Sequence, residues 1–99
     1  MRDKQDIQPL RLVEKEVVDD LIPISYREDK LQHYGFLVKD VEETLEDLGI
    51  WDSALVQKGS DGTKRVAHEE LIPLLVDEVQ TLKRQVRILQ TLMSDFLGG

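Results

Sequence analysis

The sequence predicts a mainly α-helical α+β fold, with short β-hairpins in a compact N-terminal part (1–67) and one long C-terminal helix (68–97). Three observations lead to this fold class. A heptad pattern of apolar residues runs through the last third of the chain. Two pairs of strand-like segments each enclose a turn, and a short amphipathic segment precedes each pair. Together these features indicate a single domain over residues 1–99.

Two short helices are expected in the N-terminal part. Apolar residues at steps of three and four predict a helix over residues 9–21, with Pro9 in its first turn and Pro23 just beyond its end. The same kind of pattern predicts a helix over residues 40–48, whose first turn is acidic and suits the positive end of the helix dipole. Gly49 is expected to end it.

A hairpin is expected after each short helix. Residues 22–27 and 31–38 carry apolar side chains at alternate positions on either side of a charged turn. Gly35, inside the second of these strands, indicates a bulge or a close approach of the backbone. Residues 54–58 and 63–67 flank an Asp-Gly turn, which is a strong hairpin signal.

The long helix carries an unbroken apolar heptad pattern, which we call the heptad seam. Its members lie at alternating steps of three and four: Ile72, Leu75, Val79, Leu82, Val86, Leu89, Met93 and Phe96. This spacing predicts a coiled coil between copies of the chain, and the alternative is an amphipathic helix packed on its own domain. β-Branched residues at position a with leucine at d favour two strands, whereas Val76, Leu92 and Leu97 widen the apolar face and suit three.

Composition supports association and argues against several other classes. A chain of 99 residues buries a small core, and it has no cysteine for disulfides or thiolate metal sites. His33 and His68 are too few for a zinc site, so no metal and no cofactor are expected. The net charge of −7 disfavours nucleic acid and anionic lipid as partners. No apolar run is long enough to span a membrane, and no secretion signal is visible.

Few residues suggest catalysis when each is considered alone. The acidic residues of segment 40–47 are on a helix and lack the loop spacing of calcium ligands, so a solvated face is expected. His33 is a candidate general base, although a lone histidine is more often structural. Trp51 is expected to cover the core. No nucleophile elbow and no glycine-rich phosphate loop is present, which argues against an ordinary small-molecule enzyme.

Three segments taken together carry a recognisable pattern. They are Pro23-Ile24-Ser25-Tyr26-Arg27, His33-Tyr34-Gly35-Phe36-Leu37 and Leu71-Ile72-Pro73-Leu74-Leu75. Their order and spacing resemble the intramolecular chaperone domain at the C-termini of bacteriophage tail spikes and fibres, also called the endosialidase chaperone domain. Related domains occur in the myelin regulatory factor family. The resemblance covers essentially the whole chain, although Lys39 stands where the family pattern has glutamine and His68 where tyrosine is common.

The resemblance implies a function in assembly. Family members form homotrimers that bring three fibre or spike chains into register, and the domain then removes itself by autoproteolysis. The implied partners are two further copies of the chain and the trimeric fibre or spike domain upstream. The implied location is the host cytoplasm during virion assembly, and the domain would be absent from the mature fibre. The alternatives are a generic coiled-coil module or the related domain of a membrane-anchored transcription factor.

The resemblance also implies where cleavage chemistry would lie. Family autoproteolysis uses a Ser-Lys dyad in a motif of the form S-D-x-R-x-K. Arg2-Asp3-Lys4 matches its second half, which places Lys4 at the dyad lysine, while the Ser-Asp pair would precede Met1. His33 matches a family histidine implicated in cleavage. The chain is therefore expected to resemble the released product, or a separate reading frame that starts after the cut, without protease activity of its own.

Overall fold

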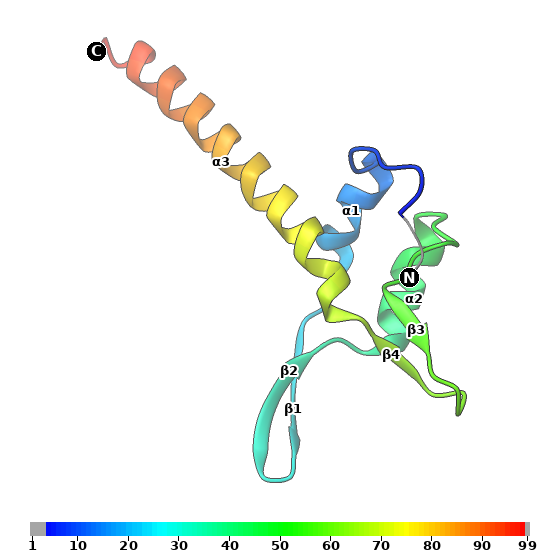
Figure 1. The fold of residues 1–99 in the computed structure, drawn as a ribbon. Helices are drawn as coiled ribbons and strands as arrows, with labels where there is room; N and C mark the ends of the chain where they lie inside the picture. The colour runs from blue at the N-terminus through cyan, green and yellow to red at the C-terminus, as the bar shows by residue number, and fades with distance from the viewer. Residues whose placement is uncertain (1–3, 99) are drawn as a thin grey trace.

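A computed structural model describes residues 4–98 and confirms the α+β class (Figure 1). Three α-helices, two separate antiparallel hairpins and one 3-10 turn make up this part of the chain. In chain order they are α1 (Leu12–Asp20), β1 (Ile24–Glu28), β2 (Leu31–Gly35), α2 (Val38–Asp47), β3 (Val56–Lys58), β4 (Lys64–Val66), η1 (His68–Glu70) and α3 (Leu71–Phe96). The helix α3 extends far beyond the other elements, and the β1–β2 hairpin projects away from its C-terminal end.

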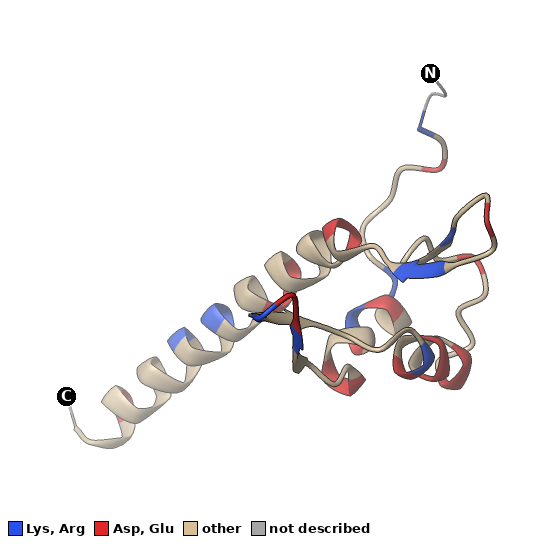
Figure 2. Ribbon diagram, turned by 90° about the horizontal axis from the view of Figure 1, so that it is seen from below, with Lys and Arg blue, Asp and Glu red and all other residues tan. Residues whose placement is uncertain are grey.

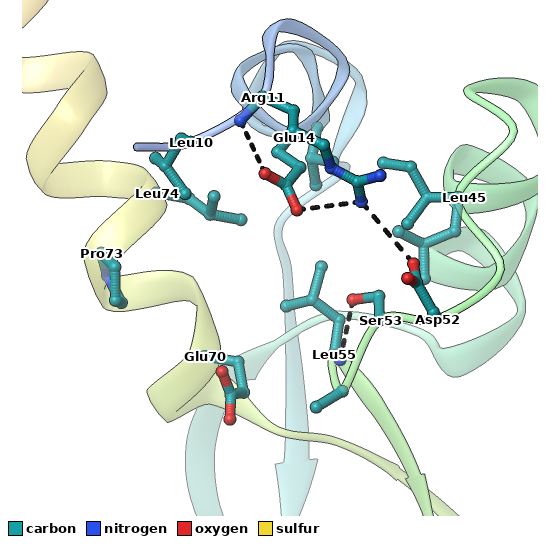
Figure 3. A pocket seen from close by; sticks show the side chains of 13 residues that line it. Leu10, Arg11, Glu14, Leu45, Asp52, Ser53, Leu55, Glu70, Pro73 and Leu74 are labelled. Carbon is teal, nitrogen blue, oxygen red and sulfur yellow. Dashed lines mark hydrogen bonds and ion pairs between the residues drawn. The ribbon is translucent and has the colours of Figure 1, made fainter. Parts of the chain in front are cut away.

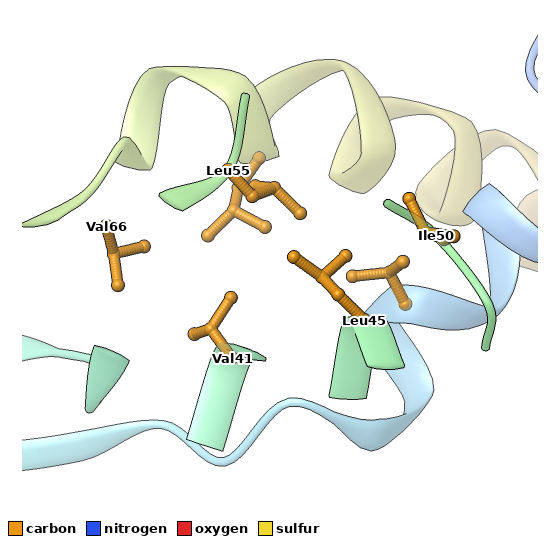
Figure 4. Packing of buried hydrophobic residues seen from close by; sticks show 7 residues of the cluster. Val41, Leu45, Ile50, Leu55 and Val66 are labelled. Atoms are coloured by element: carbon orange, nitrogen blue, oxygen red, sulfur yellow. The ribbon is translucent and has the colours of Figure 1, made fainter. Parts of the chain in front are cut away.

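The core lies where α1, α2, the β3–β4 hairpin and the first turns of α3 meet (Figure 4). One cluster of buried side chains forms it: Val17, Val41, Leu45, Ile50, Leu55, Val66 and Leu71. In α2, Val41 and Leu45 are four residues apart, so both face the core, whereas the acidic residues of this helix are mostly exposed. The core is small, and most of α3 lies outside it.

Helix α1 begins later than the sequence predicts. Arg11 is its N-cap, and the backbone N–H of Arg11 donates to Glu14 Oε1 at 2.7 Å. This capping interaction starts the helix at Leu12, so the expectation that Pro9 lies in the first turn is wrong. The helix ends before Pro23, as predicted.

The first hairpin is confirmed, but its second strand is shorter than expected. Asp29 and Lys30 both have positive φ, 53° and 67°, which is the conformation of a two-residue type I′ turn. Strand β2 stops at Gly35 instead of continuing to residue 38. The chain turns there because Phe36 packs against the core, and α2 then begins at Val38, two residues before its predicted start.

The end of α2 and the second hairpin match their sequence signals. Gly49, with φ +71°, follows the helix, and the N–H of Ile50 donates to Leu45 O at 2.9 Å. This is a Schellman motif, and it brings Ile50 into the core beside Leu45. In the β3–β4 turn, Thr63 donates two hydrogen bonds to Asp61 Oδ1, and they lower the pKa of this carboxyl.

The last helix begins with a 3-10 turn rather than with an α-helical turn at residue 68. Pro73 is the third residue of α3, where its missing N–H removes no hydrogen bond within the helix. The 26 residues of α3 span about 39 Å. Since the molecule measures 64 × 41 × 28 Å, α3 accounts for much of its longest dimension.

Candidate functional site

The heptad seam on α3 is exposed along its whole length. The exposed fractions of its members range from 48% at Leu75 to 88% at Phe96. Even Leu82, in the middle of the helix, is 50% exposed. Soluble monomers rarely expose a contiguous apolar surface of this extent, so the seam is a candidate interface.

A different face of α3 packs on the rest of the domain. Leu71 is buried and Leu74 packs against the core, while Glu78 and Thr81 are half-buried. Each of these residues is followed directly by a member of the seam. At about 100° per residue, the seam is therefore turned about a quarter of a circle away from the face that α3 uses within its own domain. The alternative to a coiled coil, in which the seam packs on its own domain, is therefore wrong.

Further apolar side chains flank the seam near both ends of α3, and the basic residues of the helix lie in its middle. Val76, Leu92 and Leu97, at positions e and g of the heptad, are also exposed, so the apolar surface is wider near the ends of the helix. Figure 2 shows that α3 carries its basic residues in its middle, whereas acidic residues gather on the compact part. The basic residues are Lys83, Arg84 and Arg87.

The structure is more extended than a compact monomer of this length would be. Its accessible surface is 8499 Å², whereas a compact monomer of 11.4 kDa exposes about 5,800 Å². Its radius of gyration is 18.1 Å, against about 13 Å for a compact domain of this length. Both differences reflect the protruding α3 and the projecting hairpin.

The first two of the three resembling segments meet at the base of the first hairpin. A hollow of about 420 Å³ lies there, and it is lined by Pro23, Ile24, Ser25, Tyr34, Gly35, Phe36 and His68. Further along the hairpin, Tyr26 and His33 are cross-strand partners whose rings stack with centroids 5.4 Å apart. The residues of the first two motifs thus form one patch, and His68 joins this patch to the start of α3.

His68 is the residue of this patch that sequence reasoning missed. A Cβ atom on Gly35 would lie 3.3 Å from His68 Nε2, so the absence of a side chain on Gly35 permits this close approach. The His68 ring also packs against Phe36 with centroids 6.0 Å apart. The available signal was its alignment with a position where the resembling pattern commonly has tyrosine, which indicates a packed ring.

The two residues aligned with cleavage are not brought together by any hydrogen bond or ion pair within residues 4–98. Lys4 lies in the exposed N-terminal coil, and Arg2 and Asp3 fall outside the described residues. His33 contacts Tyr26 on the hairpin. Tyr34, also in the motif, is 77% exposed. The described part of the chain therefore presents no assembled nucleophile and base.

A second hollow, of about 340 Å³, lies between α1, the start of α3 and the segment after α2 (Figure 3). On one wall Arg11 forms ion pairs with Glu14 at 3.1 Å and with Asp52 at 3.6 Å. These contacts tie the beginning of α1 to the loop before β3. Hydrogen bonds from the backbone and then the side chain of Arg11 lower the pKa of Glu14.

Glu14→Gln is expected to lower the melting temperature at neutral pH. Glutamine keeps an oxygen that can accept from the backbone N–H of Arg11, so the change removes the carboxylate charge and its ion pair with the Arg11 guanidinium. This charge contributes about 0.5–1 kcal/mol, or about 2–8 °C for a domain of this size. Folding lowers the pKa of Glu14, so its ionised carboxylate stabilises the folded state fully at any pH above the ordinary pKa of glutamate. This stabilisation is lost as the pH falls through the lowered pKa of the folded state. Thermal melts should therefore separate the wild type from Glu14→Gln at pH 7 and converge in acid. Glu16→Gln, exposed on the same helix, is the control, and an equal effect there would contradict the assignment.

Three further expectations can be compared with the structure. Trp51 is 81% exposed, so the prediction that it covers the core is wrong; Ile50, its neighbour, takes the buried position. Within residues 4–98, no group of three or more carboxylate or histidine side chains is placed to hold a metal ion. None of the described helices combines the length and apolar character that crossing a bilayer requires.

Comparisons with protein-family models, with curated proteins and with solved structures find no match to this chain.

Proposed function

We propose that this chain is a C-terminal intramolecular chaperone domain that trimerises through α3 and directs the folding of a phage tail fibre or tailspike. One observation carries the proposal: α3 presents a complete heptad seam to solvent while its neighbouring face holds the compact domain. A helix that only completed its own domain would have its apolar residues on the packed face. The meeting of the first two resembling segments with His68 at the hairpin base adds support.

The physical role of such a domain follows from the entropy of assembly. Strand pairing between three fibre chains joins residues that are far apart, so it is slow and prone to misalignment. When three copies of α3 associate, they hold the attached chains at a high local concentration and in a common alignment. Removal of the domain afterwards leaves a folded fibre without the element that set its alignment. A fibre that then unfolds cannot readily refold with its three chains aligned.

Release belongs to a precursor in this proposal. The hydroxyl oxygen of a serine from the upstream Ser-Asp pair would attack the carbonyl carbon of the adjacent peptide bond, with Lys4 accepting the hydroxyl proton. The C–N bond then breaks, the leaving amine takes up the proton, and water hydrolyses the ester that has formed, which separates the two chains. His33, which the resemblance implicates in cleavage, lies on the projecting β1–β2 hairpin. The chain by itself has no role in cutting other proteins.

The proposal is tested by fusing the chain behind a trimeric β-rich fibre domain that misfolds when expressed alone. We expect native fibre trimers, stable in detergent, from the fusion with the wild-type chain. A second fusion, in which an unrelated trimeric coiled coil replaces the chain, separates this function from that of a generic oligomerisation module. Equal yields from both fusions would favour the generic module, and aggregated fibre from the wild-type fusion would contradict the proposal.

The same fusion, built with Ser-Asp directly before Met1, tests the release step. Cleavage at that serine should appear on a denaturing gel and should disappear in Lys4→Ala. Lys30→Ala, in the turn of the hairpin, is the control and should still cut. Cleavage by Lys4→Ala would show that the dyad assignment is wrong.

A further inference from the structure

We propose that side chains beside the heptad seam hold α3 parallel to its neighbours and in one register, with Glu78 of one copy paired to Lys83 of the next. This inference rests on the proposed function, because it specifies how the copies that form the coiled coil are aligned. It concerns positions g and e, which border the seam on either side and govern orientation and partner choice in coiled coils.

Neither member of this pair has an ionic partner in its own chain among residues 4–98. Glu78 is half-buried at the boundary between the packed face and the seam, and Lys83 is exposed. Two half-buried carboxylates on α1 and α2 do have basic partners in the same chain: Glu14 pairs with Arg11, and Glu42 pairs with Lys64 at 2.8 Å. The pair on α3 thus has complementary charges available for another molecule.

The residues at g and e match only when parallel helices are aligned without a shift. In that alignment each g residue lies against the e residue five positions later in the neighbouring helix. The contacts beyond the compact domain are then Glu78 with Lys83, Gln85 with Gln90, and Leu92 with Leu97. They are an acid with a base, an amide with an amide, and an apolar residue with an apolar residue. All three contacts join side chains of compatible chemistry.

Shifted registers lose every one of these matches. A shift of one heptad in one direction places Glu78 against Gln90 and Gln85 against Leu97. The opposite shift places Glu78 against Val76, Gln85 against Lys83 and Leu92 against Gln90. Each shift leaves a charged or amide group against an apolar side chain, which costs free energy when water is excluded.

The antiparallel arrangement is also disfavoured. When two antiparallel helices overlap along the full seam, residue 84 of one helix lies level with residue 84 of the other. In an antiparallel pair, position e of one helix lies against position e of the other, and position g lies against position g. Lys83 would then face Lys83 of the second copy, while Glu78 would face Leu92. Like charges in contact, together with an unpaired carboxylate, act against this orientation.

Charge reversal tests the pair. Glu78→Lys and Lys83→Glu should each raise the dissociation constant of the oligomer by about tenfold, given three weak ion pairs for each trimer. The double variant Glu78→Lys/Lys83→Glu should return the constant close to that of the wild type, since it restores complementary contacts. Sedimentation equilibrium measures the three constants, and rising salt should reduce the differences among them.

Arg87→Glu is the matched control, because it makes the same change of charge as Lys83→Glu on an exposed position away from the seam. It should shift the constant much less than Lys83→Glu. If Arg87→Glu and Lys83→Glu have equal effects, or if the double variant is no better than the singles, the proposed pairing is overturned.

Orientation is measured separately with spin labels. The chain has no cysteine, so Ser94→Cys provides a single labelling site on the outer face of α3. Parallel helices place the labels at one level, whereas overlapped antiparallel helices separate them by about 30 Å along the axis. The short distance is expected, and the long one would overturn the inference while leaving oligomerisation intact. A wild-type chain that remains monomeric would instead overturn the proposed function and this inference with it.

Discussion

Leu82→Asp is expected to convert the oligomer into monomers. Leu82 lies at a d position in the middle of the seam and is 50% exposed in the single chain. In a coiled coil it would be buried, and each aspartate would then place an unpaired carboxylate in an apolar layer. The penalty is about 3 kcal/mol or more for each charge, which raises the dissociation constant by more than about a hundredfold.

Sedimentation velocity at micromolar concentration measures this conversion. Since Leu82 is not part of the core cluster, the circular dichroism of the hairpins and of α1 and α2 should change little. Thr91→Asp introduces the same carboxylate on the outer face of α3 and should keep the oligomer. An unchanged mass for Leu82→Asp would show that the seam is not the interface.

Leu55→Ala is expected to destabilise the compact part while leaving the seam intact. Leu55 is 3% exposed and belongs to the core cluster, so its truncation leaves a cavity beneath α3. Substitutions of this type cost about 2–5 kcal/mol, which is a large share of the stability of a small domain. The melting temperature should fall by at least about 8 °C.

Leu31→Ala controls for the loss of apolar surface, because Leu31 is 64% exposed at the end of the hairpin. It should melt within a few degrees of the wild type. At a temperature where Leu55→Ala is still folded, its oligomeric mass should equal that of the wild type, since no residue of the seam has changed. Loss of the oligomer under that condition would contradict the separation of core and seam.

Local sequence signals specified most of the elements. Three of these signals involve only residues that are close in the sequence. They are the alternation of apolar and polar residues on either side of Asp29-Lys30, the end of α2 at Gly49, and the Asp61-Gly62 turn. Such signals depend on backbone conformation and short hydrogen bonds, which adjacent residues control. For that reason both hairpins and the three helices were predictable, with boundaries differing by one to three residues at most of their ends.

Contacts between distant segments were beyond these signals. The contact of His68 with Gly35 joins residues that are far apart in the chain, and no periodic pattern reports it. The burial of Ile50 instead of Trp51 is a local effect by contrast, because the Schellman motif at Gly49 brings Ile50 back beside Leu45. The beginning of α1 is also set locally, by the side chain of Glu14, which accepts a hydrogen bond from the backbone N–H of Arg11 three residues earlier.

By itself the sequence determined that the last helix carries a continuous apolar seam, because a heptad repeat is a property of spacing alone. It left open whether that seam covers the domain or faces outward. Only the tertiary structure decided this, since Leu71 and Leu74 attach α3 to the core and thereby set the rotation of the whole helix. Once those two side chains are buried, the geometry of the α-helix turns the seam about 100° away from the core and into solvent.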